Sequence, residues 1–180
     1  MEELLYSDLS ITEIAPDIYH TKFMTPSCVD IIKELCIESN NWSTEEFQHS
    51  TRDIYFEETF PEWFELLKGA ETNIWQYFSR LLSTSPFEFY TIFAIKYEME
   101  DQRKLTLHHD ESYISGSVKL NADYTGAELV FPRQKFSNLE IVPGDLLLWP
   151  SQITHPHKCT PLKSGKKYSL TFWTKEVEDN

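Results

Sequence analysis

Residues 104–120 read KLTLHHDESYISGSVKL, a stretch typical of β-structure. It contains two short runs, 104–110 and 112–120, that are typical of neighbouring β-strands. Similar runs lie at 88–99, 127–131, 139–142, 145–149, 153–157 and 167–174, with turn residues such as Gly126, Pro143-Gly144 and Ser164-Gly165 between them. Many short strands separated by turns predict a β-sandwich or barrel.

The part of the chain before Pro86 has helical patterns instead. Thr25-Pro26-Ser27 is a helix start, and apolar residues recur at helical spacing until Ser39. A second helical stretch runs over 61–82, with Gly69 as a point where it can divide. We therefore expect a mainly β protein with N-terminal helices that buttress the β core. No linker interrupts the sequence, so residues 1–180 are expected to form one domain, with 1–86 as mostly helical support and 87–175 as the β core.

The net charge of −13 excludes some partner classes. A strongly acidic chain does not bind phosphate backbones or anionic membranes through its charge, so we expect no nucleic acid and no membrane as partners. The charge is uneven, because residues 1–100 hold 19 acids and 6 bases whereas residues 101–180 hold 10 of each. Two interpretations stay open for the acidic half: a solvated face, or a surface for a cationic partner.

The cysteine content and the N-terminal sequence bear on the compartment. Three cysteines, Cys28, Cys36 and Cys159, form neither a metal-type pair nor an even disulfide set. The first residues lack the basic start and apolar run of a signal peptide, and the chain has no apolar run of membrane-spanning length. We expect a cytoplasmic protein with reduced, packed cysteines.

Two histidine clusters in the β-rich half carry the candidate chemistry. In the stretch His108-His109-Asp110, strand alternation places His108 and Asp110 on one face. The second cluster, Thr154-His155-Pro156-His157, can supply a further imidazole from a distant strand. Two histidines and one carboxylate form the facial triad of non-haem Fe(II) sites. A His-X-Asp pair alone also occurs as a surface pair, so the motif needs support from other residues.

That support comes from the residues after His157 and from a wider pattern. A basic residue, Lys167, stands ten positions after His157. With this spacing the chain resembles the 2-oxoglutarate and Fe(II)-dependent dioxygenases, and more narrowly the catalytic domain of procollagen lysyl hydroxylases. The matching stretches are Thr51-Arg52-Asp53-Ile54, Phe93-Ala94-Ile95-Lys96-Tyr97, His108-His109-Asp110-Glu111-Ser112, Leu120-Asn121, Tyr124-Thr125-Gly126, Thr154-His155-Pro156-His157 and Gly165-Lys166-Lys167-Tyr168.

The resemblance implies a double-stranded β-helix (jelly roll) fold and a set of site residues. It implies that His108, Asp110 and His157 hold the iron, with His155 as the rival for the third position. Lys167 would bind the distal carboxylate of 2-oxoglutarate. The Ser169 hydroxyl and the Tyr97 phenol are further candidates for the same carboxylate, although Tyr97 can equally be a packed aromatic at a strand end. Asp53 is a candidate for substrate contact, or a surface salt bridge.

The resemblance also implies the reaction. The expected enzyme hydroxylates an unactivated C–H bond with Fe(II), 2-oxoglutarate and O₂, with ascorbate as a supporting reductant. A lysyl side chain of a protein or peptide is the favoured, cationic substrate. Lysyl hydroxylases have Arg where this chain has Lys167, so prolyl hydroxylation remains an alternative, as does a free amino acid or other small molecule. A metal-free jelly-roll binding module is the non-enzymatic alternative, and both a monomer and a homodimer remain open.

Overall fold

The computed structural model describes residues 3–44 and 51–177. Within them, the largest sheet has seven strands. In spatial order they are β1 (Thr12–Ala15), β2 (Ile18–Lys22), β10 (Asp145–Pro150), β6 (Ile114–Lys119), β13 (Lys167–Glu176), β4 (Phe87–Tyr97) and β3 (Arg52–Tyr55). Every pairing in this sheet is antiparallel.

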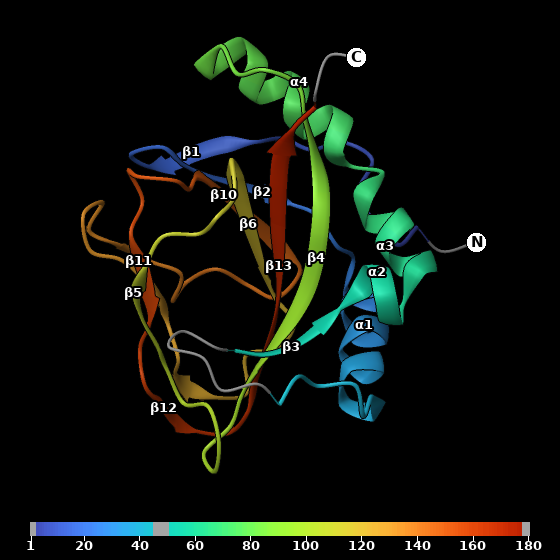
Figure 1. Cartoon of the computed structure of the whole chain (residues 1–180), viewed down its shortest axis with the longest axis vertical. Coiled ribbons are helices and arrows are strands. Elements are labelled where there is room, and N and C mark those ends of the chain that lie inside the picture. The colour runs from blue at the N-terminus through green and yellow to red at the C-terminus, as the bar shows by residue number, and fades with distance from the viewer. Residues whose placement is uncertain (1–2, 45–50, 178–180) are drawn as a thin grey trace.

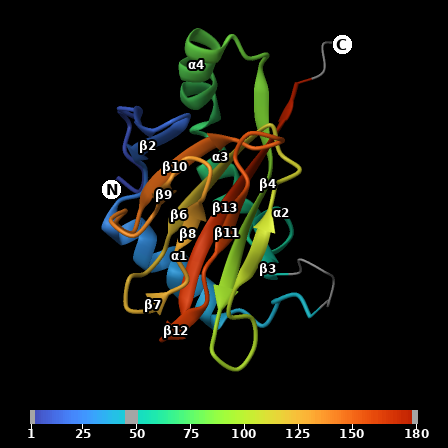
Figure 2. The same cartoon turned by 90° about the vertical axis from the view of Figure 1, so that its left-hand side faces the viewer.

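A smaller sheet lies opposite the seven-stranded one, on the left of Figure 1 and toward the viewer in Figure 2. Its four strands, in order, are β5 (Leu105–His108), β11 (His157–Cys159), β8 (Leu129–Phe131) and β9 (Phe136–Ser137). A further pair joins β12 (Leu162–Ser164) and β7 (Thr125–Gly126). The two facing antiparallel sheets form the expected double-stranded β-helix. The predicted mainly β fold class is confirmed.

The helices are α1 (Pro26–Glu38), α2 (Phe56–Thr59), α3 (Pro61–Lys68) and α4 (Glu71–Leu82). The first three lie on the side of the large sheet that faces away from the small sheet (Figure 1). The Thr25 hydroxyl accepts a hydrogen bond from the Cys28 backbone N–H and so caps α1, as the Thr-Pro-Ser start predicts. The 61–82 stretch divides at Gly69, as its sequence indicates. Within the described residues, no helix has the length and apolar character needed to cross a membrane.

Strand alternation gives the large sheet two different faces. Along β13, Leu170 and Phe172 are fully buried in the core under the helices. The alternate residues Ser169 and Thr171 line a cavity between the two sheets. The apolar outer face therefore holds the helices, while the more polar inner face is left for a site.

Some of the sequence expectations are corrected by the structure. The segments 12–22 and 52–55 were expected to be part of the helical support but form strands β1, β2 and β3 of the large sheet. The segment 139–142 is not a strand, and the predicted strand at 153–157 begins only at His157 and continues to Cys159. The proline at position 156 explains the second difference, because proline has no N–H to donate within a sheet.

Candidate active site

The three predicted metal ligands come together at one end of the small sheet. His108 is the last residue of β5, and His157, the first residue of β11, lies directly opposite it in the antiparallel register. Asp110 follows β5 by two residues. The Nε2 atom of each imidazole is 3.4 Å from Asp110 Oδ1. All three ligand atoms lie within 4.8 Å of one another, so the cluster could hold one metal ion.

Backbone carbonyls fix the orientation of both imidazoles. His108 Nδ1 is 2.8 Å from the Thr106 carbonyl oxygen, and His157 Nδ1 is 3.0 Å from the His155 carbonyl oxygen. A carbonyl oxygen only accepts, so each Nδ1 must donate and carry a hydrogen. Nε2 therefore faces Asp110: it donates to the carboxylate when it carries a proton, and it offers a lone pair to a metal ion when it does not. Metal-bound histidines are commonly held in this way.

Asp110 is held as an anion in spite of its burial. The residue is 7% exposed, and burial alone would raise its pKa. Hydrogen bonds from His108 and His157 outweigh this effect, and the Ser115 hydroxyl, which donates to Oδ2 over 2.7 Å, adds to them, so the pKa falls below its usual range. Ser115 also leaves Oδ1 as the oxygen that faces the two imidazoles. Two neutral imidazoles and a carboxylate on one side of a cavity fit the ligand set of Fe(II).

The cluster opens into a cavity of about 1110 Å³ between the two sheets. The other predicted site residues line it as well: Lys167 and Ser169 from β13 and Tyr97 from the end of β4. In the sheet register, Lys167 lies opposite Tyr97. The structure therefore brings the residues predicted for the metal and for the cosubstrate into a single cavity.

Lys167 is only 4% exposed, and three groups surround its ammonium. Nζ donates to the Ala127 carbonyl oxygen over 2.8 Å, is 3.7 Å from Cys159 Sγ and lies 5.1 Å from the centre of the Tyr97 ring. Burial raises the pKa of the Tyr97 phenol well above its usual value, with Cys159 and the carboxylates of Asp53 and Asp110 adding to the effect. Tyr97 is therefore a neutral hydroxyl beside a cation.

His155 lies outside the metal cluster, although its sequence position made it the rival of His157. Its Nε2 is 3.1 Å from the Pro16 carbonyl oxygen, and its Nδ1 is 2.8 Å from the Thr154 hydroxyl. These contacts tie the segment before β11 to the β1–β2 turn. They also fix the position of the His155 backbone carbonyl, which orients His157.

Sequence patterns missed two polar residues near the site. Ser115, which donates a hydrogen bond to Asp110, is separated from it by a turn without a strand or helix pattern. Lys119 is 8% exposed and sits across from Ser169 in the register. Burial lowers its pKa to about 8, and the nearby charge of Lys167 contributes. Its Nζ donates to the Leu139 carbonyl oxygen. Inward alternation of β6 was the signal that could have found both residues.

A family model matches the part of the chain that contains this cavity. Residues 93–175 match the 2OG-Fe(II) oxygenase superfamily. Residues 93–175 therefore carry a 2OG-Fe(II) oxygenase domain. The matched range includes His108, Asp110, His157 and Lys167. Oxygenases of this family use Fe(II), 2-oxoglutarate and O₂, so the expected enzyme class and cofactors are confirmed.

Sequence relatives of this oxygenase domain include procollagen lysyl hydroxylases. It is 27% identical over 185 residues to the procollagen lysyl hydroxylase and glycosyltransferase of Acanthamoeba polyphaga mimivirus, which covers 92% of this chain and 20% of the relative. It is 24% identical over 178 residues to human procollagen-lysine,2-oxoglutarate 5-dioxygenase 2, covering 91% of this chain and 24% of the relative. The chain thus spans about a quarter or less of these relatives.

Solved structures with a similar fold include two prolyl hydroxylases. The viral collagen prolyl hydroxylase of Paramecium bursaria Chlorella virus-1, in complex with 2OG, aligns with a TM-score of 0.68 at 16% identity, over 91% of this chain and 97% of that one. A Pseudomonas putida prolyl-4-hydroxylase aligns with a TM-score of 0.67 at 15% identity, over 90% and 94% of the two chains. At these identities the likeness establishes the fold.

Proposed function

We propose that this oxygenase domain hydroxylates a lysyl side chain of a protein or peptide. One C–H bond of the substrate becomes C–OH, while 2-oxoglutarate and O₂ are converted to succinate and CO₂. The observation that carries the proposal is the convergence of two oriented imidazoles, one ionised carboxylate and one buried ammonium in a single cavity.

In this proposal His108, Asp110 and His157 hold Fe(II) on one side of the cavity. Bound Fe(II), with 2-oxoglutarate, supplies the activation of O₂ that a hydroxylation of an unactivated C–H bond needs. The chain's own residues orient the ligands, exclude water and position the substrate carbon. The carbonyls of Thr106 and His155 keep both imidazoles in the required tautomer, and Ser115 directs Asp110 Oδ1 toward the metal position.

Lys167 is proposed to bind the distal carboxylate of 2-oxoglutarate. Its ammonium is buried, points into the cavity wall and is held by a neutral carbonyl rather than by a carboxylate. An incoming carboxylate would therefore gain a charge-assisted hydrogen bond without first breaking an ion pair. The Ser169 and Tyr97 hydroxyls lie on the same wall and can donate to the second oxygen of that carboxylate.

Two features support a lysyl substrate. The relatives that cover most of this chain are named as lysyl hydroxylases. The cavity is also lined by two carboxylates that are not among the proposed metal ligands, Asp53 and Glu111, whereas Lys167 is the single Lys or Arg among its described lining residues. Negative potential at the substrate side favours a cationic side chain.

The test is a product analysis by mass spectrometry. The protein is incubated with Fe(II), ascorbate, 2-oxoglutarate and air, together with lysyl peptides, prolyl peptides or free lysine. We expect a gain of one oxygen atom on lysine within the lysyl peptides, with stoichiometric succinate. Oxygen gain on prolyl peptides alone, or on free lysine alone, would replace this proposal by one of its alternatives.

A prolyl substrate is the second candidate, and Lys167 favours it. The resembled lysyl hydroxylases have Arg at this position, whereas prolyl hydroxylases often have Lys. An ammonium supplies the charge but not the two parallel hydrogen bonds of a guanidinium. The substitution changes how the cosubstrate is held, and the substrate-binding part of the cavity decides between the two substrates.

We further propose a reducing compartment, the cytoplasm, as the place of action. Cys28, Cys36 and Cys159 are all buried free thiols. Burial raises the pKa of Cys28 to about 11 and that of Cys36 to about 12, so neither is a reactive thiolate. Alkylation of the unfolded, unreduced protein should label all three thiols.

A further inference from the structure

Asp53 lies on the inner face of the large sheet, in the same row as a predicted cosubstrate residue. On β3, Ile54 is fully buried under the helices, so alternation turns its neighbour Asp53 toward the cavity, which it lines. In the register Asp53 is opposite Ile95, and Ile95 is opposite Ser169. Two strand spacings, about 10 Å, therefore separate the backbones of Asp53 and Ser169.

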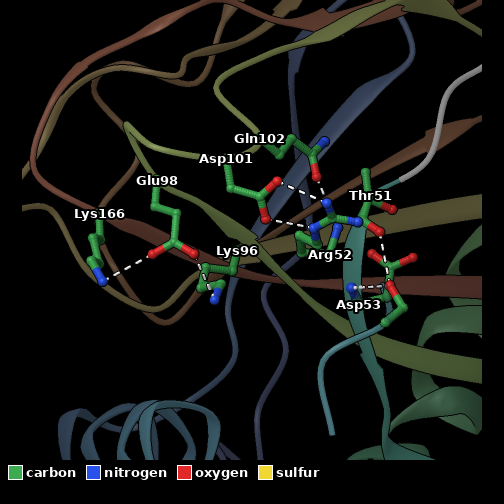
Figure 3. Close-up of polar contacts among 9 residues, drawn as sticks. Thr51, Arg52, Asp53, Lys96, Glu98, Asp101, Gln102 and Lys166 are labelled. Carbon is green, nitrogen blue, oxygen red and sulfur yellow. Dashed lines mark hydrogen bonds and ion pairs between the residues drawn. The ribbon is translucent and has the colours of Figure 1, made fainter. Parts of the chain in front are cut away.

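The backbone around Asp53 is held by polar contacts on both sides (Figure 3). The Arg52 guanidinium makes two contacts with the Asp101 carboxylate, and the Arg52 N–H donates to Gln102 Oε1. On the other side, the Ser43 hydroxyl donates to the Thr51 carbonyl oxygen and accepts from the Asp53 N–H. The position of Asp53 is thus set by contacts that do not involve its carboxylate.

The carboxylate itself is incompletely satisfied. Among the described residues, the buried Oδ1 atom has no hydrogen-bond partner. Burial raises the pKa of Asp53 to about 6, against the lowering effects of Thr51 and Arg52. A carboxyl group with one buried, unpartnered oxygen destabilises a fold, and such groups in a cleft are typical of functional positions.

The walls near Asp53 suit a long aliphatic chain with a charged end. The aromatic residues Trp42, Tyr55, Phe93 and Trp173 line the same cavity. The Phe93 ring packs against both Tyr55, at 5.5 Å between centroids, and Trp173, at 5.1 Å. Methylene groups pack on such rings, and a cation beside their faces is attracted by them.

We propose that Asp53 is the specificity-determining residue that binds the ammonium group of the substrate lysine. This inference rests on the proposed lysyl hydroxylation and adds the residue that selects the substrate. The ammonium would supply the missing partner of Oδ1, while Lys167, on the same face two strands away, receives the anionic cosubstrate. Opposite charges on one sheet face would then keep the two ligands in separate parts of the cavity.

The test compares Asp53→Asn with the wild type on a matched pair of peptides, one with lysine and one with Nε-acetyl-lysine. Binding is measured by calorimetry on protein loaded with Fe(II) and 2-oxoglutarate under argon, where no turnover occurs. We expect the wild type to prefer the lysyl peptide and Asp53→Asn to bind it about 10- to 100-fold more weakly, with little change for the acetylated peptide. Glu58→Gln, an exposed charge change on α2, is the control and should keep the preference.

The outcomes separate this inference from the proposed function. If the wild type hydroxylates lysyl peptides and Asp53→Asn keeps the full preference for them, the role of Asp53 is wrong while lysyl hydroxylation stands. If the wild type neither prefers nor hydroxylates lysyl peptides, lysyl hydroxylation fails and the inference fails with it. Circular dichroism, together with the binding of Fe(II) and 2-oxoglutarate under argon, checks that Asp53→Asn folds and retains its metal and cosubstrate sites.

Discussion

At the scale of single residues, Lys167 is the residue that we propose to bind the distal carboxylate of 2-oxoglutarate. Its ammonium lies 2.8 Å from a backbone carbonyl and beside the neutral Tyr97 ring, with no carboxylate bonded to it among the described residues. The charge is therefore buried with only a neutral partner. Burial of such a cation destabilises the ligand-free protein, and a bound carboxylate offsets this effect.

We predict that Lys167→Ala raises the KM for 2-oxoglutarate about 10- to 100-fold, because one charge-assisted hydrogen bond is lost. Initial rates of succinate formation at varied cosubstrate concentration measure it. Lys167→Arg keeps the charge and should retain most of the affinity. The affinity for metal should be the same in all three proteins, and an unchanged KM in Lys167→Ala would remove Lys167 from the cosubstrate site.

Asp53 gives a prediction for pH. Its pKa of about 6 means that the free enzyme loses the anionic form below that pH, so kcat/KM for a lysyl peptide should fall about tenfold for each further pH unit. The profile of Asp53→Asn should lack this step.

The stability of the wild type should change with pH in the opposite sense. The folded state holds the Asp53 proton between about pH 4 and 6 while the unfolded state releases it, so stability falls as pH rises through that window. Asp53→Asn should therefore be more stable than wild type at pH 7, by about 1 kcal/mol.

The residue types at the metal cluster were predictable from sequence, because His-X-Asp, a distant His and a base ten residues later carry the chemistry themselves. The contacts that orient them were not. Ser115 meets Asp110 through a turn, and the Thr106 and His155 carbonyls belong to the backbone, which has no sequence signature. Strand alternation could place Ser115 on the inner face, but only the coordinates show that it bonds to Asp110.

At the scale of elements, the turn Gly126-Ala127 connects the β7–β12 pair to Lys167 in the wall of the cavity. Both residues have positive φ, 76° and 48°. A Cβ at position 126 would collide with the Pro161 carbonyl oxygen. The same turn presents the Ala127 carbonyl to Lys167, so the left-handed backbone here positions the hydrogen-bond acceptor of the proposed cosubstrate residue.

We predict that Gly126→Ala lowers the free energy of unfolding by about 2 kcal/mol, because both the φ angle and the close approach of Pro161 oppose a side chain. Urea denaturation measures the change. Ala127→Gly is the matched control: it relieves the left-handed strain but loses a buried methyl, so its net effect should be below about 0.5 kcal/mol. Equal stability of Gly126→Ala and the wild type would contradict the account of this turn.

Helix ends and long strands were predicted well, and short strands poorly. Thr25, Pro26 and Gly69 act locally, so the bounds of α1 and the break between α3 and α4 follow from neighbouring residues. The strands β1, β2 and β3 are 4 or 5 residues long and are defined by their partners in the sheet. Pairing with β10 and β4 comes from far along the chain, and no local pattern encodes it.

At the scale of the whole molecule, three apolar clusters pack on the two faces of the large sheet and separate the supporting helices from the candidate site. One core lies under the helices, and smaller clusters around Phe93 and Trp149 lie between the sheets, beside the cavity. The metal cluster joins β5 and β11 of the small sheet to Ser115 of the large one. A bound ion should therefore link the two sheets.

We predict that Fe(II) stabilises the entire domain. At a free metal concentration of 100 times Kd, ligand linkage contributes about 2.7 kcal/mol, which corresponds to a rise in Tm of about 5–10 °C for a chain of this size. Differential scanning fluorimetry under argon, with and without a chelator, measures it. The variant His108→Ala should show no rise in Tm. A wild-type Tm that changes with neither metal nor chelator would contradict a metal bridge between the sheets.

The most direct test of the central claim is an anaerobic titration of the protein with Fe(II) and 2-oxoglutarate, followed by visible absorption. The account predicts a weak charge-transfer band that needs both additions in the wild type. The band should be absent in His108→Ala, and in Lys167→Ala it should require a much higher cosubstrate concentration. A wild type that shows no band at saturating Fe(II) and 2-oxoglutarate, and that releases no succinate when air is admitted, would contradict the account.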